Sequence, residues 1–160
     1  IPNDYWKYEE NSEKIASIFT HVHAENHNFI GIYENHAGCE RGYFWTKDRK
    51  PITLPKKDSH GNNLYIPDLI LYNEKENLIL LIEGKQYKTL SNGLKEIKNF
   101  DSIEKEFINL YYPGANIQRW ITLFGGTNTI IPHEKVLLQI NKYGDILINE
   151  KAPQSFKNMF

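Results

Sequence analysis

Two apolar runs near the middle of the chain are separated by a polar stretch. Residues 66–72 are rich in β-branched and aromatic side chains, and residues 78–82 are continuously apolar. The five residues between them, 73–77, are polar and suit a turn. Apolar runs joined by a short polar turn are typical of a β-hairpin. We therefore predict two antiparallel strands in this part of the chain.

Apolar residues before and after this hairpin are spaced in patterns that predict helices and further strands. Three- and four-residue intervals in the N-terminal part predict one buried face of a helix over residues 4–23. These positions are Ile15, Ile18, Phe19 and Val22. A second helix is predicted over 94–111, where Pro113 and Gly114 follow. Further short strands are predicted at residues 29–33, 43–45, 52–54 and 118–124, with a second hairpin over 136–148.

The order of these elements indicates the fold class. A strand, helix and strand follow one another over residues 78–124, which predicts a crossover between two parallel strands. We therefore expect an α/β protein with a central mixed β-sheet flanked by helices. The 160 residues suit one compact domain over 1–160, either alone or within a larger protein.

Composition narrows the class of protein further. No apolar run approaches the ~18–20 residues that cross a bilayer, so we expect no membrane partner. The single cysteine, Cys39, excludes an intrachain disulfide and suits a reducing compartment, so a cytoplasmic location is expected. The 19 Lys and Arg residues nearly balance the 20 Asp and Glu residues, which leaves the local distribution of charge more informative than its sum.

Charged residues stand at the open end of the predicted hairpin. Asp68 follows Pro67 at the start of the first strand, and Glu83, Gly84 and Lys85 end the second. Charges beside apolar runs are costly unless something pairs them. A divalent metal ion would pair the two carboxylates, and a phosphate group would suit the lysine.

The hairpin geometry decides whether these groups meet. A turn centred near Lys75 sets Asp68 opposite Ile82 or Glu83. Side chains alternate along a strand, so Glu83 and Lys85 share a face, which Asp68 joins only in the register that sets it opposite Glu83. Gly84 has no side chain, which leaves its carbonyl free to approach a ligand.

Pro67-Asp68 followed by Glu83-Gly84-Lys85 resembles the signature of the PD-(D/E)XK nuclease superfamily, whose largest group is the type II restriction endonucleases. The resemblance implies that Asp68 and Glu83 bind Mg²⁺, that the Gly84 carbonyl adds a ligand, and that Lys85 positions the attacking water. It also implies an acidic residue from the first helix. Glu10 and Glu13 are three residues apart and share a side of that helix.

The same resemblance implies a restriction-endonuclease-like core and a Mg²⁺-dependent endonuclease that hydrolyses phosphodiester bonds of double-stranded DNA. A type II restriction endonuclease, or its cleavage domain, is expected to act as a homodimer or with a partner subunit. Polar residues on both sides of the motif are then expected to contact DNA. They are Lys56, Lys57, Gln86 and Lys88.

Other interpretations stay open at this stage. A structure-selective or repair nuclease, such as a junction resolvase, and a non-catalytic DNA-binding module of the same fold both fit the pattern. Asp68 and Lys85 can also form an ordinary ion pair at a solvated strand end. Four histidines lie close together, but their spacing is not that of a closed zinc site. They are His21, His23, His27 and His36.

Overall fold

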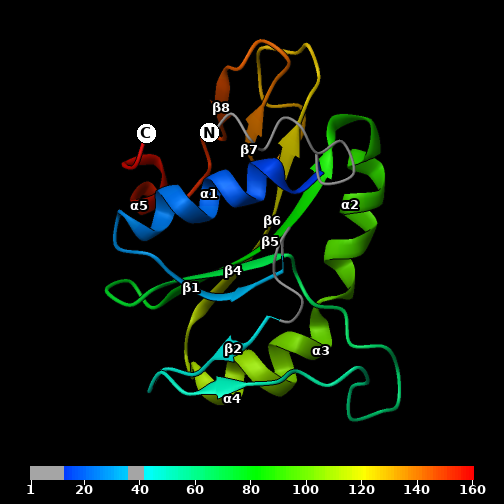
Figure 1. Ribbon diagram of the computed structural model, residues 1–160, viewed down its shortest axis with the longest axis vertical. Coiled ribbons are helices and arrows are strands. Elements are labelled where there is room, and N and C mark those ends of the chain that lie inside the picture. Colours follow the sequence, from blue (N-terminus) through cyan, green and yellow to red (C-terminus); the bar gives the residue numbers. More distant parts are fainter. Residues whose placement is uncertain (1–12, 36–41) are drawn as a thin grey trace.

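The structure is a computed structural model that describes residues 13–35 and 42–160 (Figure 1). The helices are α1 (Ile15–Glu25), η3 (Tyr87–Thr89), α2 (Leu90–Glu96), η4 (Ile97–Asn99), α3 (Asp101–Ile103), η5 (Glu104–Ile108), α4 (Asn109–Tyr111) and α5 (Gln154–Lys157). The strands are β1 (Ile30–Glu34), β2 (Phe44–Trp45), β3 (Pro51–Ile52), β4 (Leu69–Asn73), β5 (Leu78–Gln86), β6 (Asn116–Phe124), β7 (Val136–Ile140) and β8 (Ile146–Ile148). No helix in these ranges is long and apolar enough to cross a membrane.

Within the described residues, one mixed sheet has the strand order β1-β4-β5-β6-β7-β8, and β2 pairs with β3 separately. Strands β1, β4 and β5 are antiparallel neighbours, whereas β5, β6 and β7 run parallel. The hairpin formed by β4 and β5, the crossover to β6 and the second hairpin, β7–β8, are therefore confirmed. The protein is a mixed α/β structure, as the sequence predicts.

The continuous apolar run in β5 is buried because both faces of the sheet are covered. Ile79 and Leu81 join a hydrophobic cluster with the helical segment after β5, and Leu80 and Ile82 join a second cluster with α1 and α5. Figure 1 shows α1 and α5 together, with α3 and α4 beside the hairpin of β2 and β3. Strands covered on both faces carry apolar residues at every position, without alternation.

The helix predicted over residues 94–111 begins earlier, at Leu90, and is not uniform. A 3₁₀ segment, η4, and a π-helical segment, η5, interrupt it. Buried apolar residues of this stretch are spaced by three, three, five and four positions, and are Ile97, Phe100, Ile103, Ile108 and Tyr112. A uniform α-helix cannot direct such a series to one side, whereas tighter and wider turns keep each member in the core.

Arginine 119 of β6 holds this interrupted helical segment on the sheet. Its guanidinium donates to the Ile97 carbonyl at 2.8 Å, to Glu104 at 2.8 Å and to Asp101 at 2.6 Å. The hydrogen bonds to the carboxylates raise the pKa of Arg119 above its ordinary value, although burial opposes this. The Ile97 carbonyl, which lies where the regular helix stops, thus gains a partner.

The N-terminal helix expected over residues 4–23 is seen in its described part as α1, which continues to Glu25; residues 4–12 lie outside the described residues. This helix packs closely against β5 and β6. The Ser17 and Thr122 hydroxyls share a buried hydrogen bond of 2.7 Å. A Cβ atom at Gly84 would lie 2.5 Å from Ser17 Oγ and 2.7 Å from the Glu13 backbone oxygen. Only glycine therefore permits this approach of helix to sheet.

We predict that Gly84→Ala lowers the free energy of unfolding by about 1–3 kcal/mol, because the added methyl group meets a backbone oxygen that cannot rotate away. Urea unfolding measures the change. Adding Ser17→Ala should restore only part of the loss, since the Glu13 oxygen still obstructs the methyl group. An unfolding midpoint equal to that of the wild type would contradict this packing role.

Candidate active site

The hairpin register brings the two motif carboxylates together. Leu69 pairs with Ile82, so Asp68, one residue before β4, lies opposite Glu83. Of the two registers left open by the sequence, this is the one that gives both side chains the same face. Glu83 and Lys85 share that face by strand alternation, on the side of the sheet covered by α2.

Both carboxyl groups are shielded from water. Glu83 is 8% exposed, and the Asp68 side chain is 12% exposed. Burial, the negative charge of Asp68 and a hydrogen bond to the Asp68 carboxylate raise the pKa of Glu83 to about 10, although Lys85 opposes the shift. Without a bound cation, the pair therefore holds a proton at neutral pH.

Two groups outside the carboxylate pair also contact Asp68. The Gly84 backbone N–H donates to Asp68 Oδ2 at 2.9 Å, and Lys14 Nζ lies 3.8 Å from Asp68 Oδ1. The same ammonium donates to the Asn35 carbonyl at 3.1 Å. Lys14 therefore holds the turn before α1 next to the carboxylate pair. The motif spacing contains no signal for this lysine, because it comes from a different part of the chain.

Lys85 is held by Glu96, a residue to which the motif spacing does not point. Its Nζ lies 3.0 Å from Glu96 Oε1 at the end of α2, and its side chain is 13% exposed. Burial would lower the pKa of Lys85, but the hydrogen bond and charge of Glu96, with the charges of Glu83 and Glu13, raise it. The group therefore remains an ammonium. The alternative ion pair with Asp68 is not formed among the described contacts; Glu96 takes that position.

Glycine 93 of α2 lets this lysine pass beneath the helix. A Cβ atom there would lie 2.8 Å from Lys85 Cγ and 3.2 Å from Ile121 Cδ1. The aliphatic stem of Lys85 thus packs under the helix while its ammonium reaches the carboxylate at the helix end.

Glu10 and Glu13 are the two candidates for the acidic residue that the first helix was expected to supply. Glu10 lies outside the described residues. Glu13 precedes α1, and its backbone oxygen is one of the two atoms that leave no room for a side chain at Gly84. Its carboxylate is near enough to help raise the pKa of Lys85. Glu13 therefore belongs to the electrostatic surroundings of the site, whereas the roles of the Glu13 carboxylate and the Gly84 carbonyl as metal ligands stay predictions.

No cluster of three or more His, Cys, Asp or Glu side chains is arranged for a metal ion among the described residues. Asp68 and Glu83 supply two carboxylates, which suits Mg²⁺, because that ion is commonly held by one or two carboxylates and keeps several waters. In the histidine-rich segment, His21 instead lies between Glu25 at 2.8 Å and Glu34 at 2.7 Å. His36, which belongs to the same segment, lies outside the described residues.

Two of the residues predicted to contact DNA lie at the carboxyl end of β5, beyond the carboxylate pair. Gln86 and Lys88 line a cavity of about 460 Å³ together with Tyr87, residues 124–127 and Lys142. The cavity opens at the carboxyl ends of β5 and β6, which is where open α/β sheets usually bind ligands. We call it the strand-end cavity. Neither carboxylate of the pair lines it, but its lysines can contact phosphate groups of a nucleic-acid backbone.

The other two predicted contact residues lie in a loop that packs elsewhere. Lys57 Nζ donates to Asn63 at 2.6 Å, and the Lys56 carbonyl accepts from the Leu64 amide at 3.0 Å. The neighbouring Asp58 accepts from Ser102 of α3 at 3.0 Å. Figure 1 shows this loop next to α3, away from the end of β5. None of the described contacts joins Lys56 or Lys57 to the carboxylate pair.

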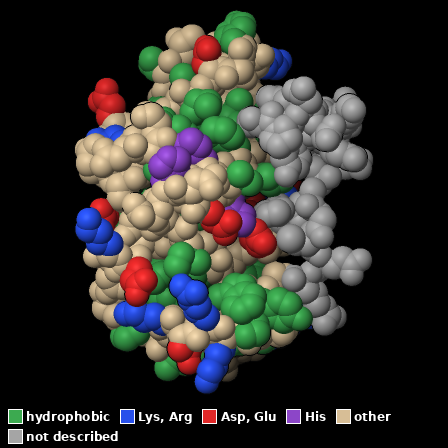
Figure 2. Space-filling model, turned by 60° about the vertical axis from the view of Figure 1, so that its left-hand side comes forward, with side chains coloured by type: hydrophobic (Ala, Val, Ile, Leu, Met, Phe, Trp, Pro, Cys, Tyr) green, Lys and Arg blue, Asp and Glu red, His purple; other side chains and the backbone are tan. Residues whose placement is uncertain are grey.

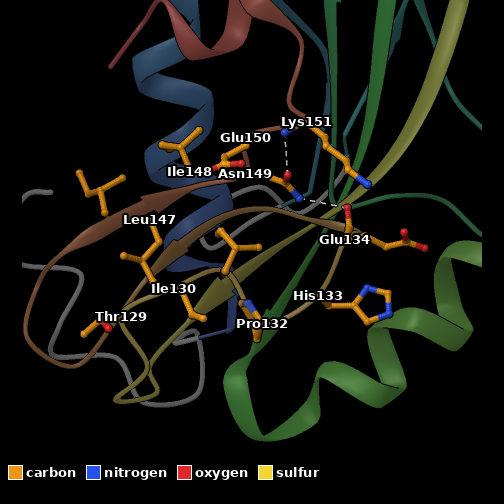
Figure 3. A pocket seen from close by; sticks show the side chains of 12 residues that line it. Thr129, Ile130, Pro132, His133, Glu134, Leu147, Ile148, Asn149, Glu150 and Lys151 are labelled. Carbon is orange, nitrogen blue, oxygen red and sulfur yellow. Dashed lines mark hydrogen bonds between the residues drawn. The ribbon is translucent and has the colours of Figure 1, made fainter.

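A cavity of about 590 Å³ lies between residues 129–134 and β8 (Figure 3). The amide of Asn149 in this cavity already has partners, because it donates to the Glu134 carbonyl at 3.0 Å and accepts from the Lys151 amide at 2.8 Å. None of the described residues predicted for the site lines it. The carboxylate pair is therefore the better candidate for chemistry. Comparisons with protein-family models, curated proteins and solved structures found no match.

We predict that the metal-free protein loses stability as pH rises, because folding raises the pKa of Glu83 from 4.5 to about 10. The stabilisation from the protonated group is complete below pH 4.5 and is lost as the pH rises towards 10. Its slope is at most about 1.4 kcal/mol per pH unit. Urea unfolding with a chelator between about pH 5 and 9 measures this, and Glu83→Gln should flatten the profile. Parallel profiles for the two proteins would contradict the assignment.

Proposed function

We propose that this protein is a Mg²⁺-dependent endodeoxyribonuclease of the restriction-endonuclease type. The observation that carries the proposal is the buried contact between the Asp68 and Glu83 carboxyl groups, next to the Lys85 ammonium. Two buried carboxylates repel each other unless a proton or a cation lies between them. A metal ion that binds phosphate groups would satisfy both carboxylates, and a phosphate group would suit the positive charge of Lys85.

The arrangement of elements supports a restriction-endonuclease-like core. Helix α1 covers one face of the sheet, and the helical segment from α2 to α4 covers the other. A helix, an antiparallel meander, a helix and a parallel strand follow one another through β6. The short strands β2 and β3 and residues 53–68 form an insertion within the meander.

Each residue of the site has a role in this proposal. Asp68 and Glu83 would hold Mg²⁺, which lowers the pKa of a bound water and neutralises charge on the scissile phosphate. Lys85 orients the attacking water and stabilises the developing negative charge. It acts as a donor only, because its pKa is raised and it stays protonated. Glu96 fixes the ammonium at 3.0 Å and is a positioning residue.

The path of DNA runs past the end of β5 in this proposal. The strand-end cavity lies at the carboxyl end of β5, where Gln86 follows Lys85 and points to the opposite face of the sheet, and two lysines of that cavity, Lys88 and Lys142, would contact backbone phosphates. Restriction endonucleases usually pair two catalytic sites to cut both strands of a duplex. The proposal therefore includes a second copy of the chain or a partner subunit.

We predict that the protein nicks or linearises supercoiled plasmid in the presence of Mg²⁺ and that a chelator stops the reaction. Asp68→Asn and Glu83→Gln should each lower the rate at least about 100-fold, because each removes one of two negative ligands. Gel electrophoresis of the plasmid measures the rate. Glu150→Gln, at an exposed carboxylate outside the site, is the matched control and should cut normally.

Sequencing of the DNA ends then defines the reaction further. Discrete cut positions in linear duplex DNA agree with restriction, whereas preferred cutting of branched junctions would replace it with a resolvase. A plasmid that stays intact with Mg²⁺, or one cut equally well by Asp68→Asn, would end the nuclease proposal.

We predict that Lys85→Ala abolishes turnover but leaves binding of duplex DNA within about threefold of the wild type, because only one of several cations is lost. Glu96→Gln should slow cleavage about tenfold, since the ammonium keeps a neutral hydrogen-bond partner but loses the ion pair. Cleavage rates and electrophoretic mobility shifts separate the two effects. Normal cleavage by Lys85→Ala would contradict its role.

A further inference from the structure

A cavity of about 430 Å³ lies between the edge strand β1, the turn that joins β2 to β3, and the end of β4. This volume falls in the range of about 300–1,000 Å³ usual for small-molecule sites. Its lining combines aromatic rings with charged side chains, namely Trp45, Tyr72, Tyr112, Lys47, Arg49 and Glu74. Figure 2 shows hydrophobic side chains beside lysine or arginine side chains in the lower part of the molecule, where β2 and β3 lie in Figure 1. We call this cavity of about 430 Å³ the aromatic cavity.

One polar group of the aromatic cavity has no partner among the described residues. Tyr72 is 4% exposed, and its hydroxyl forms no hydrogen bond among the described residues. Its ring packs edge-on against Tyr112 at 4.7 Å, and the Tyr112 hydroxyl donates to the Trp45 carbonyl. A buried hydroxyl without a partner destabilises the folded state. Because this oxygen is closed off from solvent, a ligand with a polar edge supplies the missing hydrogen bond only when a neighbouring side chain moves aside.

A second feature of the same cavity is costly in the free protein. Arg49 has a φ of 63°, in the left-handed region that favours glycine and asparagine. The tight turn requires it, because the Arg49 amide donates to the Thr46 carbonyl at 2.9 Å and the Thr46 amide donates to the Lys50 carbonyl at 2.9 Å. An exposed arginine at this position places a guanidinium at the cavity at the expense of backbone strain.

From these two features we propose that the aromatic cavity binds a nucleotide, that is, a planar base with an attached phosphate. The exposed ring of Trp45, which is 40% accessible, offers a stacking surface for the base. Lys47 and Arg49 carry the charges that suit the phosphate. The Tyr72 hydroxyl and the Glu74 carboxylate match polar groups on the base edge.

The proposal does not depend on the nuclease activity. Tyr72 lies four residues along β4 from Asp68, about 13 Å at the rise of a strand. The buried residue Ile70 lies on the same face between them, so the aromatic cavity and the carboxylate pair are separate sites. A variant of the carboxylate pair, Asp68→Asn, should therefore bind the nucleotide as the wild type does.

Titration calorimetry with the four deoxynucleoside 5′-monophosphates, and with a short single-stranded oligonucleotide, tests the proposal. Tyr72→Phe should weaken binding about three- to tenfold, and Arg49→Gly about tenfold or more. Both variants should unfold at or above the wild-type temperature, because each removes a local cost in the free protein. Binding lost with stability kept or gained is the expected signature of a ligand site.

Matched controls lie outside the cavity. Tyr65→Phe alters an exposed tyrosine, and Asn28→Gly relieves another left-handed residue, with a φ of 72°, so both should bind normally. Tighter binding of the oligonucleotide than of every mononucleotide assigns the nucleotide to a nucleic-acid strand, and the reverse assigns a free nucleotide. No saturable binding of either probe, or binding that Tyr72→Phe and Arg49→Gly leave unchanged, would overturn the proposal.

Discussion

The contact between Asp68 and Glu83 depends on one constraint, the register of the hairpin formed by β4 and β5. Pairing of Leu69 with Ile82 sets the two carboxylates side by side at the end of the hairpin. A shift of one residue would turn Asp68 to the opposite face and separate them. Apolar residues on both faces hold this register, because any shift would also move the buried side chains of β4 and β5 out of their clusters.

Helices on the two faces of the sheet then enclose the pair. On one face, the absence of a side chain at Gly84 allows α1 to approach β5, which brings Glu13 and Lys14 to the site. On the other face, Gly93 allows the stem of Lys85 to pass under α2 and reach Glu96. The low exposure that raises the pKa of Glu83 is thus a consequence of close packing at two glycines.

The sequence predicted those parts of the site that neighbouring strands determine. Alternation and turn length are local properties, so the hairpin, the shared face of Glu83 and Lys85 and the crossover to β6 were all accessible. Lys14 and Glu96 were missed because each comes from a different element and is brought to the site by packing. Lys56 and Lys57 were predicted to contact DNA from their proximity to the motif along the chain. The structure places them in a loop that packs against α3, and their contact with DNA stays a prediction.

The helix after β5 was also predicted only in part, because packing decides the rest of its conformation. A helical period was correctly predicted there, but its interruptions depend on how Ile97, Phe100 and Ile108 fit the sheet beneath them. The Tyr72 hydroxyl, which finds no partner in the part of the chain that the structure describes, and the left-handed Arg49 are likewise properties of the folded chain. Neither has a signal in the sequence, because tyrosine and arginine occur in many surroundings.

The central claim is that a divalent cation binds between the Asp68 and Glu83 carboxyl groups. Anomalous diffraction from crystals grown with Mn²⁺, which uses the same oxygen ligands as Mg²⁺, tests it most directly. We expect an anomalous peak in contact with both carboxylates, which disappears in Asp68→Asn crystals. Crystals of the wild type with no peak at this position, and with the two carboxyl groups still sharing a hydrogen bond, would contradict the account.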